Sequence, residues 1–328
     1  MFPCFKAMKD RKPEDEAVFE RNKRRLMEKT THLLGGRRSG PICFLFSKEE
    51  LKEATNNYDS KQVFLDDGNF RLYKGFLQGQ QVIVKKFTVK NGLESSVLDI
   101  IISKQMNGHN GLKLVGVCLD TEIPVLVFES FKSSGTLGDR MGNRTPGFEP
   151  LPWKHRVNIA FHLACSIACF RLQLPRLVVH GGLKPSSILL DEHNVPVLTD
   201  FSSSKIISHK EGHDQKNIDV YSIGLLILAL LTGKEVCDSP PIEKSSKAYY
   251  LVDHVKECVM SERLKEIMLD PIVVVGRPLT TEKAKELRDF TLLALECTRD
   301  QLLERPRISD VLNRLGDIEL AALNNKHC

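Results

Sequence analysis

The chain has 328 residues, which suits one large domain with two lobes or two domains of ordinary size. Its composition, 41% hydrophobic and 27% charged, is that of a soluble globular protein. The formal net charge of +5 lies within residues 1–40, which hold 11 basic and 6 acidic residues. The rest of the chain is neutral, so we expect no nucleic-acid-binding surface on it.

The nine cysteines form no C-x-x-C pair, which indicates reduced thiols rather than a disulfide framework. The longest apolar run, Ile223 to Leu231, is too short to cross a bilayer, and the opening residues lack the apolar core of a secretory signal. We therefore expect a cytoplasmic protein that reaches the plasma membrane only through its partners. We expect no metal site, because Cys165 and Cys169 have no histidine pair nearby.

Residues 1–45 are predicted to form a basic N-terminal extension that is helical over 14–34. Phe19, Leu26 and Leu33 recur every seven residues along it, a narrow apolar stripe with no obvious place in the rest of the fold. The stripe and the basic charge predict a segment that docks on a partner or on a membrane surface. A plain solvated helix is the alternative.

Residues 46–59 are predicted to form a short helix, capped by Ser47 and by Glu50 three residues on. Strand patterns then dominate residues 60–133, and one helix interrupts them at 93–106. The predicted strands are β-branched or apolar runs bounded by turns, and they are 81–87, 112–120 and 124–130.

Helical periodicity dominates residues 134–320, and 321–328 form a tail. The later helices of this part are expected at 219–232, 246–260, 281–298 and 308–323. A strand-rich part followed by a helix-rich part predicts an α+β chain of two lobes rather than a repeated βαβ unit.

Several stretches occur in the order of the motifs of protein kinases, across residues 60–318. They are "RLYKG" (71–75), "VIVK" (82–85), "VVHGGLKPSSILLD" (178–191), "TDFSS" (199–203), "DVYSIG" (219–224) and "ERPRISDVL" (304–312). With "LKEATNNYD" (51–59) and "LPWKHRVNIA" (151–160), the chain resembles the plant receptor-like cytoplasmic kinases. The resemblance implies a protein-kinase-like bilobal fold, with a small antiparallel sheet lobe and a helical lobe.

In that family a glycine-rich loop and a strand lysine hold the phosphates of ATP. Here the loop keeps only Gly68, and Asp66 and Asp67 stand where phosphates would approach and would repel them. An acidic hairpin that meets no ligand is the alternative. Lys85 matches the lysine, and its partner position is Asp99, which is one methylene shorter than the usual glutamate. We expect a strained Lys85–Asp99 pair, or one that needs movement of its helix, and a structural role for it.

The catalytic loop has Gly182 in place of the base aspartate and Ser187 in place of the metal-binding asparagine, while Lys184 is retained. Glycine offers no proton acceptor, and loss of a general base alone costs about 10²–10⁴-fold in rate. Asp200 matches the metal-binding aspartate of the D-F-G motif, whose glycine is Ser202 here. An anchoring role for Asp200 in its own loop is the alternative.

We therefore expect no catalytic residue, no bound metal and no cofactor, with ATP bound weakly or not at all. The residues of the degenerate ATP site are Gly68, Lys85, Asp99, Lys184 and Asp200.

Only 18 residues separate Asp200 from Asp219, and the A-P-E motif is missing, so the activation segment is truncated to about half the usual interval. Arg305 would normally pair with the glutamate of A-P-E. We expect it to find another carboxylate, a water or a bound protein instead. The candidate interaction residues are Phe19, Leu26, Leu33 and Arg305.

The retained motif residues are those that fold the domain, whereas the lost ones handle ATP and protons. This division predicts a catalytically inactive kinase used as a binding module. Two alternatives stay open: a weakly active serine/threonine kinase, and a nucleotide-binding switch without transfer.

The chain also resembles a pseudokinase subgroup of these plant kinases, through "FSKEELKEATNNYD" (46–59), "PVLVFE" (124–129) and the degenerate glycine loop. Members of that subgroup partner a coiled-coil, nucleotide-binding, leucine-rich-repeat immune receptor. They recruit receptor-like cytoplasmic kinases that bacterial effectors modify, or they mimic such kinases and are modified themselves. The resemblance implies an adaptor of plant innate immunity with these partners and without nucleic acid.

Overall fold

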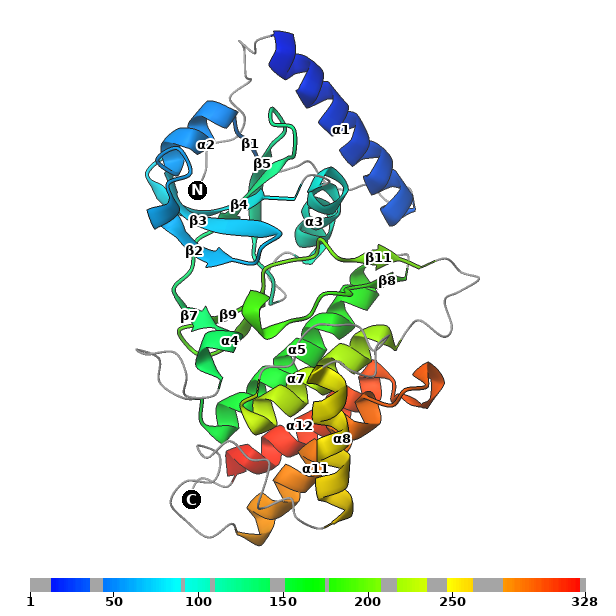
Figure 1. The fold of residues 1–328 in the computed structure, drawn as a ribbon. Helices are drawn as coiled ribbons and strands as arrows, with labels where there is room; N and C mark the ends of the chain where they lie inside the picture. The colour runs from blue at the N-terminus through cyan, green and yellow to red at the C-terminus, as the bar shows by residue number, and fades with distance from the viewer. Residues whose placement is uncertain are drawn as a thin grey trace. The chain divides into compact units, whose positions relative to one another are not determined.

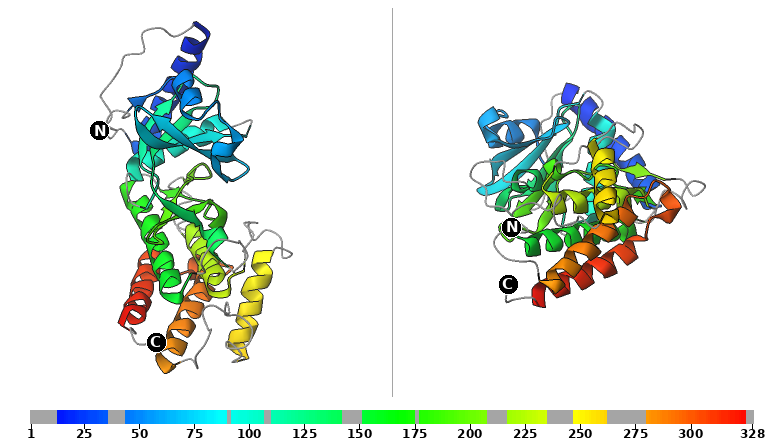
Figure 2. Two further views of the ribbon diagram at one scale, coloured as in Figure 1. Left: turned by 90° about the vertical axis from the view of Figure 1, so that its left-hand side faces the viewer. Right: turned by 60° about the horizontal axis from the view of Figure 1, so that its bottom comes forward.

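The computed structural model describes residues 13–35, 44–89, 92–106, 110–141, 151–174, 177–207, 217–234, 247–261 and 280–324 (Figure 1). The chain divides into two compact units. The first takes the described residues up to Lys132, with 172–174 and Leu198–Ile206, and the second takes the rest. Strands dominate the first unit and helices the second (Figure 2), so the predicted α+β organisation is confirmed.

The first unit is built on a six-stranded sheet in the order β1-β5-β6-β4-β3-β2. Its strands are β1 (Phe44–Leu45), β2 (Val63–Asp66), β3 (Phe70–Leu77), β4 (Gln80–Phe87), β5 (Leu114–Cys118) and β6 (Val125–Glu129), and the short β11 (Lys205–Ile206) also belongs to this unit. Its helices are α1 (Pro13–Leu34), α2 (Lys48–Ala54), α3 (Gly92–Met106) and the single 3₁₀ turn η1 (Ser60–Gln62). Neighbouring strands are antiparallel except for β1, which runs parallel to β5.

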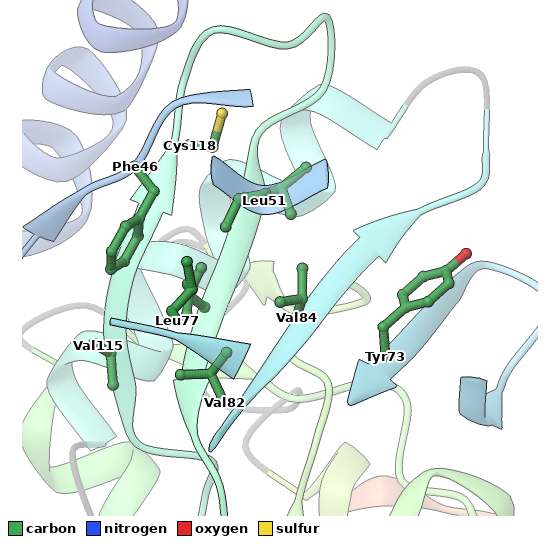
Figure 3. Packing of buried hydrophobic residues seen from close by; sticks show 10 residues of the cluster. Phe46, Leu51, Tyr73, Leu77, Val82, Val84, Val115 and Cys118 are labelled. Carbon is green, nitrogen blue, oxygen red and sulfur yellow. The ribbon is translucent and has the colours of Figure 1, made fainter. Parts of the chain in front are cut away.

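Local sequence signals account for several of these elements. The Ser47 side chain accepts the backbone N–H of Glu50, whose carboxylate in turn accepts the N–H of Ser47, so the predicted capping box at the start of α2 is confirmed. Gln78 and Gly79 both have positive φ, 49° and 81°, which gives the tight turn joining β3 to β4. Side chains on one face of the sheet form a buried cluster with Phe46 and with Leu51 of α2, and Val84 of β4 belongs to it (Figure 3).

The N-terminal helix α1 is part of the first unit. The predicted helix over 14–34 is confirmed, but Phe19, Leu26 and Leu33 are only 6%, 4% and 0% exposed. The expectation that this stripe has no place in the fold, and is free for a partner, is therefore wrong. Its heptad spacing puts the three side chains on one side of α1, and that helix contacts α3.

Polar contacts hold α1 in place as well. Asn22, fully buried, donates its amide N–H groups to the carbonyl oxygens of Leu119 (2.9 Å) and Thr121 (2.8 Å). Arg25 and Lys29 both pair with Glu94, in the first turn of α3. The helix itself carries five basic and five acidic residues, so the basic excess belongs to residues 1–12 and 36–40, which lie outside the described residues.

The second unit is mainly helical. Its helices are α4 (Leu137–Arg140), α5 (Trp153–Gln173), α7 (Ile218–Thr232), α8 (Lys247–Met260), α11 (Thr281–Cys297) and α12 (Ile308–Asn324). Its shorter elements are β7 (Ser133–Thr136), β8 (Val178–Val179), η2 (Pro185–Ser187), β9 (Ile188–Asp191), β10 (Pro196–Leu198) and η3 (Leu302–Glu304). The four later helices predicted from periodicity are confirmed. Helix α11 contacts both α7 and α12.

Within the described part of the chain, we find no helix with the length and apolar character needed to span a bilayer.

Candidate active site

The ammonium group of Lys85, on β4, lies among three oxygen atoms of the first unit. Its Nζ lies 2.5 Å from Asp99 Oδ2, 2.6 Å from Asp200 Oδ1 and 2.9 Å from the carbonyl oxygen of Thr199. An ammonium group has three N–H donors, so these three acceptors use all of them. The predicted pair between Lys85 and Asp99 therefore forms directly, and the ammonium binds a second carboxylate as well.

The cluster is closed off from solvent. Lys85 and Asp99 are both fully buried and Asp200 is 6% exposed. The Ser103 hydroxyl, one turn further along α3, donates to Asp99 Oδ1 at 3.1 Å and holds that carboxylate in place. Each charge in the cluster therefore has partners, as buried charges require.

Two aromatic rings complete the surroundings of the ammonium. The centroid of the Phe70 ring lies 3.8 Å from Lys85 Nζ, and that of Phe87 lies 5.0 Å away. Phe70 is opposite Phe87 in the register of β3 and β4, and Leu72 is opposite Lys85, so all four side chains lie on one face of the sheet. Sequence reasoning missed Phe70. The alternation of Phe70 and Leu72 in β3 was the signal that it shares a face with the cross-strand partner Lys85.

The charges of the three ionisable groups depend on one another. Burial opposes the charge of Lys85, but Asp200 and Asp99 outweigh it and raise the pKa of the ammonium. Burial raises the pKa of Asp99 to about 6, although Lys85 acts in the other direction. Burial also disfavours the ionised form of Asp200, yet Lys85 and Ser202 outweigh it and lower the pKa.

These directions predict a measurable pH dependence. Because the pKa of Asp99 is raised from 3.8 to about 6, the folded state takes up a proton between these values, and the stability that this proton contributes is lost as the pH rises through 6. On lowering the pH from 7 to 5, the wild type should gain roughly 1 kcal/mol of unfolding free energy relative to Asp99→Asn. Urea unfolding of both proteins at the two pH values measures the difference. The raised pKa would be contradicted if the unfolding free energy of the wild type minus that of Asp99→Asn stayed constant or fell between pH 7 and pH 5.

Ser202 occupies both oxygens of Asp200. Its backbone N–H donates to Oδ1 at 3.2 Å and its hydroxyl donates to Oδ2 at 2.9 Å. Together with Lys85, three donors therefore bind this carboxylate. Asp200 anchors its own loop, which is the alternative role considered for it from the sequence.

The loop between β2 and β3 is also bound internally. Asp66 accepts the backbone N–H of Gly68 at 3.0 Å through Oδ1, and the Nε–H of Arg71 at 2.8 Å through Oδ2. The N–H of Asp67 donates to the carbonyl of Phe70, and the hydroxyl of Thr88 donates to the carbonyl of Gly68. Gly68 has φ of +82°, which a glycine adopts at little cost. This geometry fits the acidic hairpin considered above, because the loop N–H groups of Asp67 and Gly68 already have acceptors.

The catalytic-loop stretch lies in the second unit and is organised by Asp219. The two oxygens of Asp219 accept the backbone N–H groups of His180 (3.0 Å) and Gly181 (3.1 Å), and the Arg171 guanidinium lies 3.8 Å away. At the base position, the N–H of Gly182 donates to His180 Nδ1. Apolar side chains on either side of these residues are buried, and they are Leu183, Ile188, Leu189 and Leu190.

At the metal-asparagine position, the Ser187 hydroxyl donates to the carbonyl of Lys184 at 3.2 Å, and the Ser187 N–H donates to the same oxygen. Of the predicted ATP-site residues, the structure brings together Lys85, Asp99 and Asp200. Gly68 lies in the hairpin of the same unit, and Lys184 lies on the loop of the second unit.

Arg305 is 8% exposed, and its guanidinium is bound by backbone carbonyls. Its donors reach the carbonyls of Arg299 (2.7 Å), Asn217 (3.3 Å) and Asp300 (3.4 Å), and the group lies 4.7 Å from the centre of the Tyr221 ring. The expectation that it must find a carboxylate, a water or a bound protein is wrong, because the carbonyls at the end of α11 and before α7 satisfy it. Half of the short interval from Asp200 to Asp219, residues 208–216, lies outside the described residues.

Comparison with known proteins identifies the family. Residues 64–223 match the model of the protein tyrosine and serine/threonine kinases. The chain is 30% identical to the putative wall-associated receptor kinase-like 16 of Arabidopsis thaliana, over 98% of this chain and 76% of that protein. The chain belongs to the protein kinase family. The kinase-like fold expected from the motifs is thereby confirmed.

Two further relatives of this kinase chain come from the same plant. The non-functional pseudokinase ZED1 is 29% identical over 84% of this chain and 87% of its own length. The serine/threonine-protein kinase ZRK1 is 28% identical over 85% of this chain and 86% of its own length. Against the wall-associated receptor kinases 1 to 5, the chain spans less than half of the relative's length.

The acidic, histidine and cysteine side chains that the structure describes form no group of three or more placed to hold a metal ion.

Proposed function

We propose that this kinase-family protein transfers no phosphate and acts as an adaptor in plant innate immune signalling. Two observations together carry the first half: glycine stands at position 182, and every N–H donor of the Lys85 ammonium is already bound. The position of the base has no side chain, and the lysine that should hold phosphates has given its three N–H donors to Asp99, Asp200 and Thr199. Phosphoryl transfer relies on positioned phosphates, bound metal and an oriented hydroxyl, so losses at several of these parts act together.

The retained parts of the motifs have structural roles. Asp219 binds the backbone of the catalytic loop, and the apolar side chains of that loop are buried. Asp200 binds Ser202 and Lys85. A protein that keeps its fold and gives up its chemistry acts through its surfaces.

The adaptor half of the proposal rests on the resemblance to plant pseudokinases. The relative named a non-functional pseudokinase is similar over 87% of its length. The partners proposed here are a coiled-coil, nucleotide-binding, leucine-rich-repeat immune receptor, receptor-like cytoplasmic kinases and bacterial effectors that modify those kinases. The place of action is the cytoplasm, with contact to the plasma membrane through these partners.

A weakly active serine/threonine kinase is the second candidate function. Retention of Lys85, Lys184 and Asp200 favours it, and so does the name of a relative, serine/threonine-protein kinase ZRK1. Label transfer from ATP separates the two functions.

The adaptor function is tested by co-expressing the chain with coiled-coil, nucleotide-binding, leucine-rich-repeat immune receptors. Epitope-tagged full-length chain should co-precipitate a member of the class from plant leaves. Leu190→Asp, which places a charge at a fully buried position, is the folding control and should capture none. Shortening the chain to remove α1 is unsuitable as a test, because Phe19, Leu26 and Leu33 are packed in the first unit. Failure of the intact chain to bind any such receptor would defeat the adaptor function, and equal capture by Leu190→Asp would mark the binding as non-specific.

A further inference from the structure

We infer that Phe70 and Ser202 close the phosphate and metal positions of this kinase fold from within, so that the first unit excludes nucleotides by filling its own site. The inference deepens the proposed loss of phosphate transfer and rests on it. It adds Phe70 and Ser202 as the two residues on which the closure depends.

The donors that would receive phosphate oxygens are already used. Lys85 gives its three N–H groups to two carboxylates and one carbonyl, all within 2.9 Å. In the loop, the N–H of Gly68 binds the carboxylate of Asp66, an anion of the chain itself. An incoming phosphate would have to separate Lys85 from a buried carboxylate and leave that charge without its partner, which is strongly unfavourable.

The ring of Phe70 covers the same ammonium. Its centroid is 3.8 Å from Lys85 Nζ, whereas a phosphate oxygen must come to about 2.7–2.9 Å from the nitrogen that binds it. The face of an aromatic ring is negative, so it attracts the ammonium and repels a phosphate. Phe70 is fully buried and packs edge-on against Phe87 at 6.2 Å, so its ring is held in this position by both the strand register and a neighbouring ring.

Ser202 closes the metal position in a similar way. A carboxylate has about four lone-pair sites, and three donors already bind Asp200: the Lys85 ammonium, the Ser202 N–H and the Ser202 hydroxyl. A divalent cation here would also stand beside an ammonium 2.6 Å from the same carboxylate and be repelled by it. A glycine at 202, as in the D-F-G motif, has no hydroxyl to offer, so the substitution itself supplies the closing group.

The test measures binding of a fluorescent ATP analogue and of Mn²⁺ to the purified full chain. The variants are Phe70→Ala, Ser202→Gly and the two combined, with Phe70→Leu as a second variant that keeps apolar volume and removes the ring. Phe76→Ala is the matched control, because Phe76 lies on the same strand and is 61% exposed. Melting curves establish that each variant is folded before its binding is measured.

We expect no saturable binding of either probe at millimolar concentration by the wild type or by Phe76→Ala. The combined variant should bind the analogue with saturation and with a Kd at least about tenfold below the highest concentration tested on the wild type, and Phe70→Leu should show part of this gain. Tight binding by the wild type would overturn the inference, and so would folded variants that gain nothing. Nucleotide binding by a wild type that transfers no label would overturn the closure alone and leave the proposed function standing, whereas label transfer would defeat both.

Discussion

Replacing Lys85 by methionine is expected to cost about 3–5 kcal/mol of unfolding free energy. The substitution keeps most of the side-chain volume but removes the ammonium that binds Asp99 and Asp200. Two carboxylates then remain in a solvent-free interior without a compensating charge, and each must either stay charged at high cost or take up a proton. The main expected effect of the substitution is therefore on the stability of the first unit.

The free energy of unfolding that Lys85→Met loses should also depend on pH. Without Lys85, the pKa of Asp99 in the folded state should rise further, and the pKa of Asp200, which the ammonium lowers, should rise as well. The stability that the protonated carboxyl groups contribute is then lost as the pH increases. Urea unfolding should therefore show a larger loss at pH 8 than at pH 5. Lys74→Met, at an exposed position of β3, is the matched control and should change stability by less than about 0.5 kcal/mol. A loss below about 1 kcal/mol for Lys85→Met would show that the carboxylates do not depend on the ammonium.

Replacing Asp219 by alanine is expected to destabilise the second unit by about 3 kcal/mol or more. Asp219 is fully buried, and it accepts the N–H groups of His180 and Gly181 and faces the guanidinium of Arg171. Alanine leaves these donors without their acceptor. Asp219→Asn, which keeps one acceptor oxygen, should cost less than the alanine change, and Asp317→Ala, at an exposed position of α12, should have almost no effect.

Hydrogen exchange can localise that loss. The amides of His180 and Gly181 should exchange faster in Asp219→Ala, together with those of β9, while the amides of β3 and β4 stay protected. Unchanged exchange at His180 would contradict the role given to Asp219. The result bears on why the catalytic-loop sequence persists without its base, since the loop contributes to the packing and hydrogen bonding of the second unit.

Local structure that depends on residues a few positions apart can be predicted from the sequence. Ser47 with Glu50 predicts the start of α2, because a capping box depends only on residues three apart in the sequence. The order of motifs likewise gave the kinase fold. The pairing of Lys85 with Asp99 followed from that order, although the contact of Lys85 with Asp200 did not.

Long-range contacts were beyond the sequence. The spacing of Phe19, Leu26 and Leu33 predicts an apolar face on the helix. It does not tell whether that face packs against α3, as the structure has it, or against a partner. Arg305 was expected to need a carboxylate because its usual partner is missing, yet backbone carbonyls satisfy a guanidinium equally well. The alternation of Phe70 and Leu72 puts both side chains on one face of β3, but which residue of β4 lies opposite depends on the strand register, which the folded sheet fixes.

Label transfer from ATP tests the central claim most directly. The purified chain is incubated with ATP labelled at the γ-phosphate, Mg²⁺ or Mn²⁺ and general protein substrates, with Lys85→Met as the background. A variant with Gly182→Asp and Ser187→Asn restores the two motif residues of the catalytic loop. We expect that neither the wild type nor the restored variant incorporates label above the Lys85→Met background, because the donors of Lys85 are bound and only 18 residues separate Asp200 from Asp219. Incorporation by the wild type that Lys85→Met abolishes would contradict it.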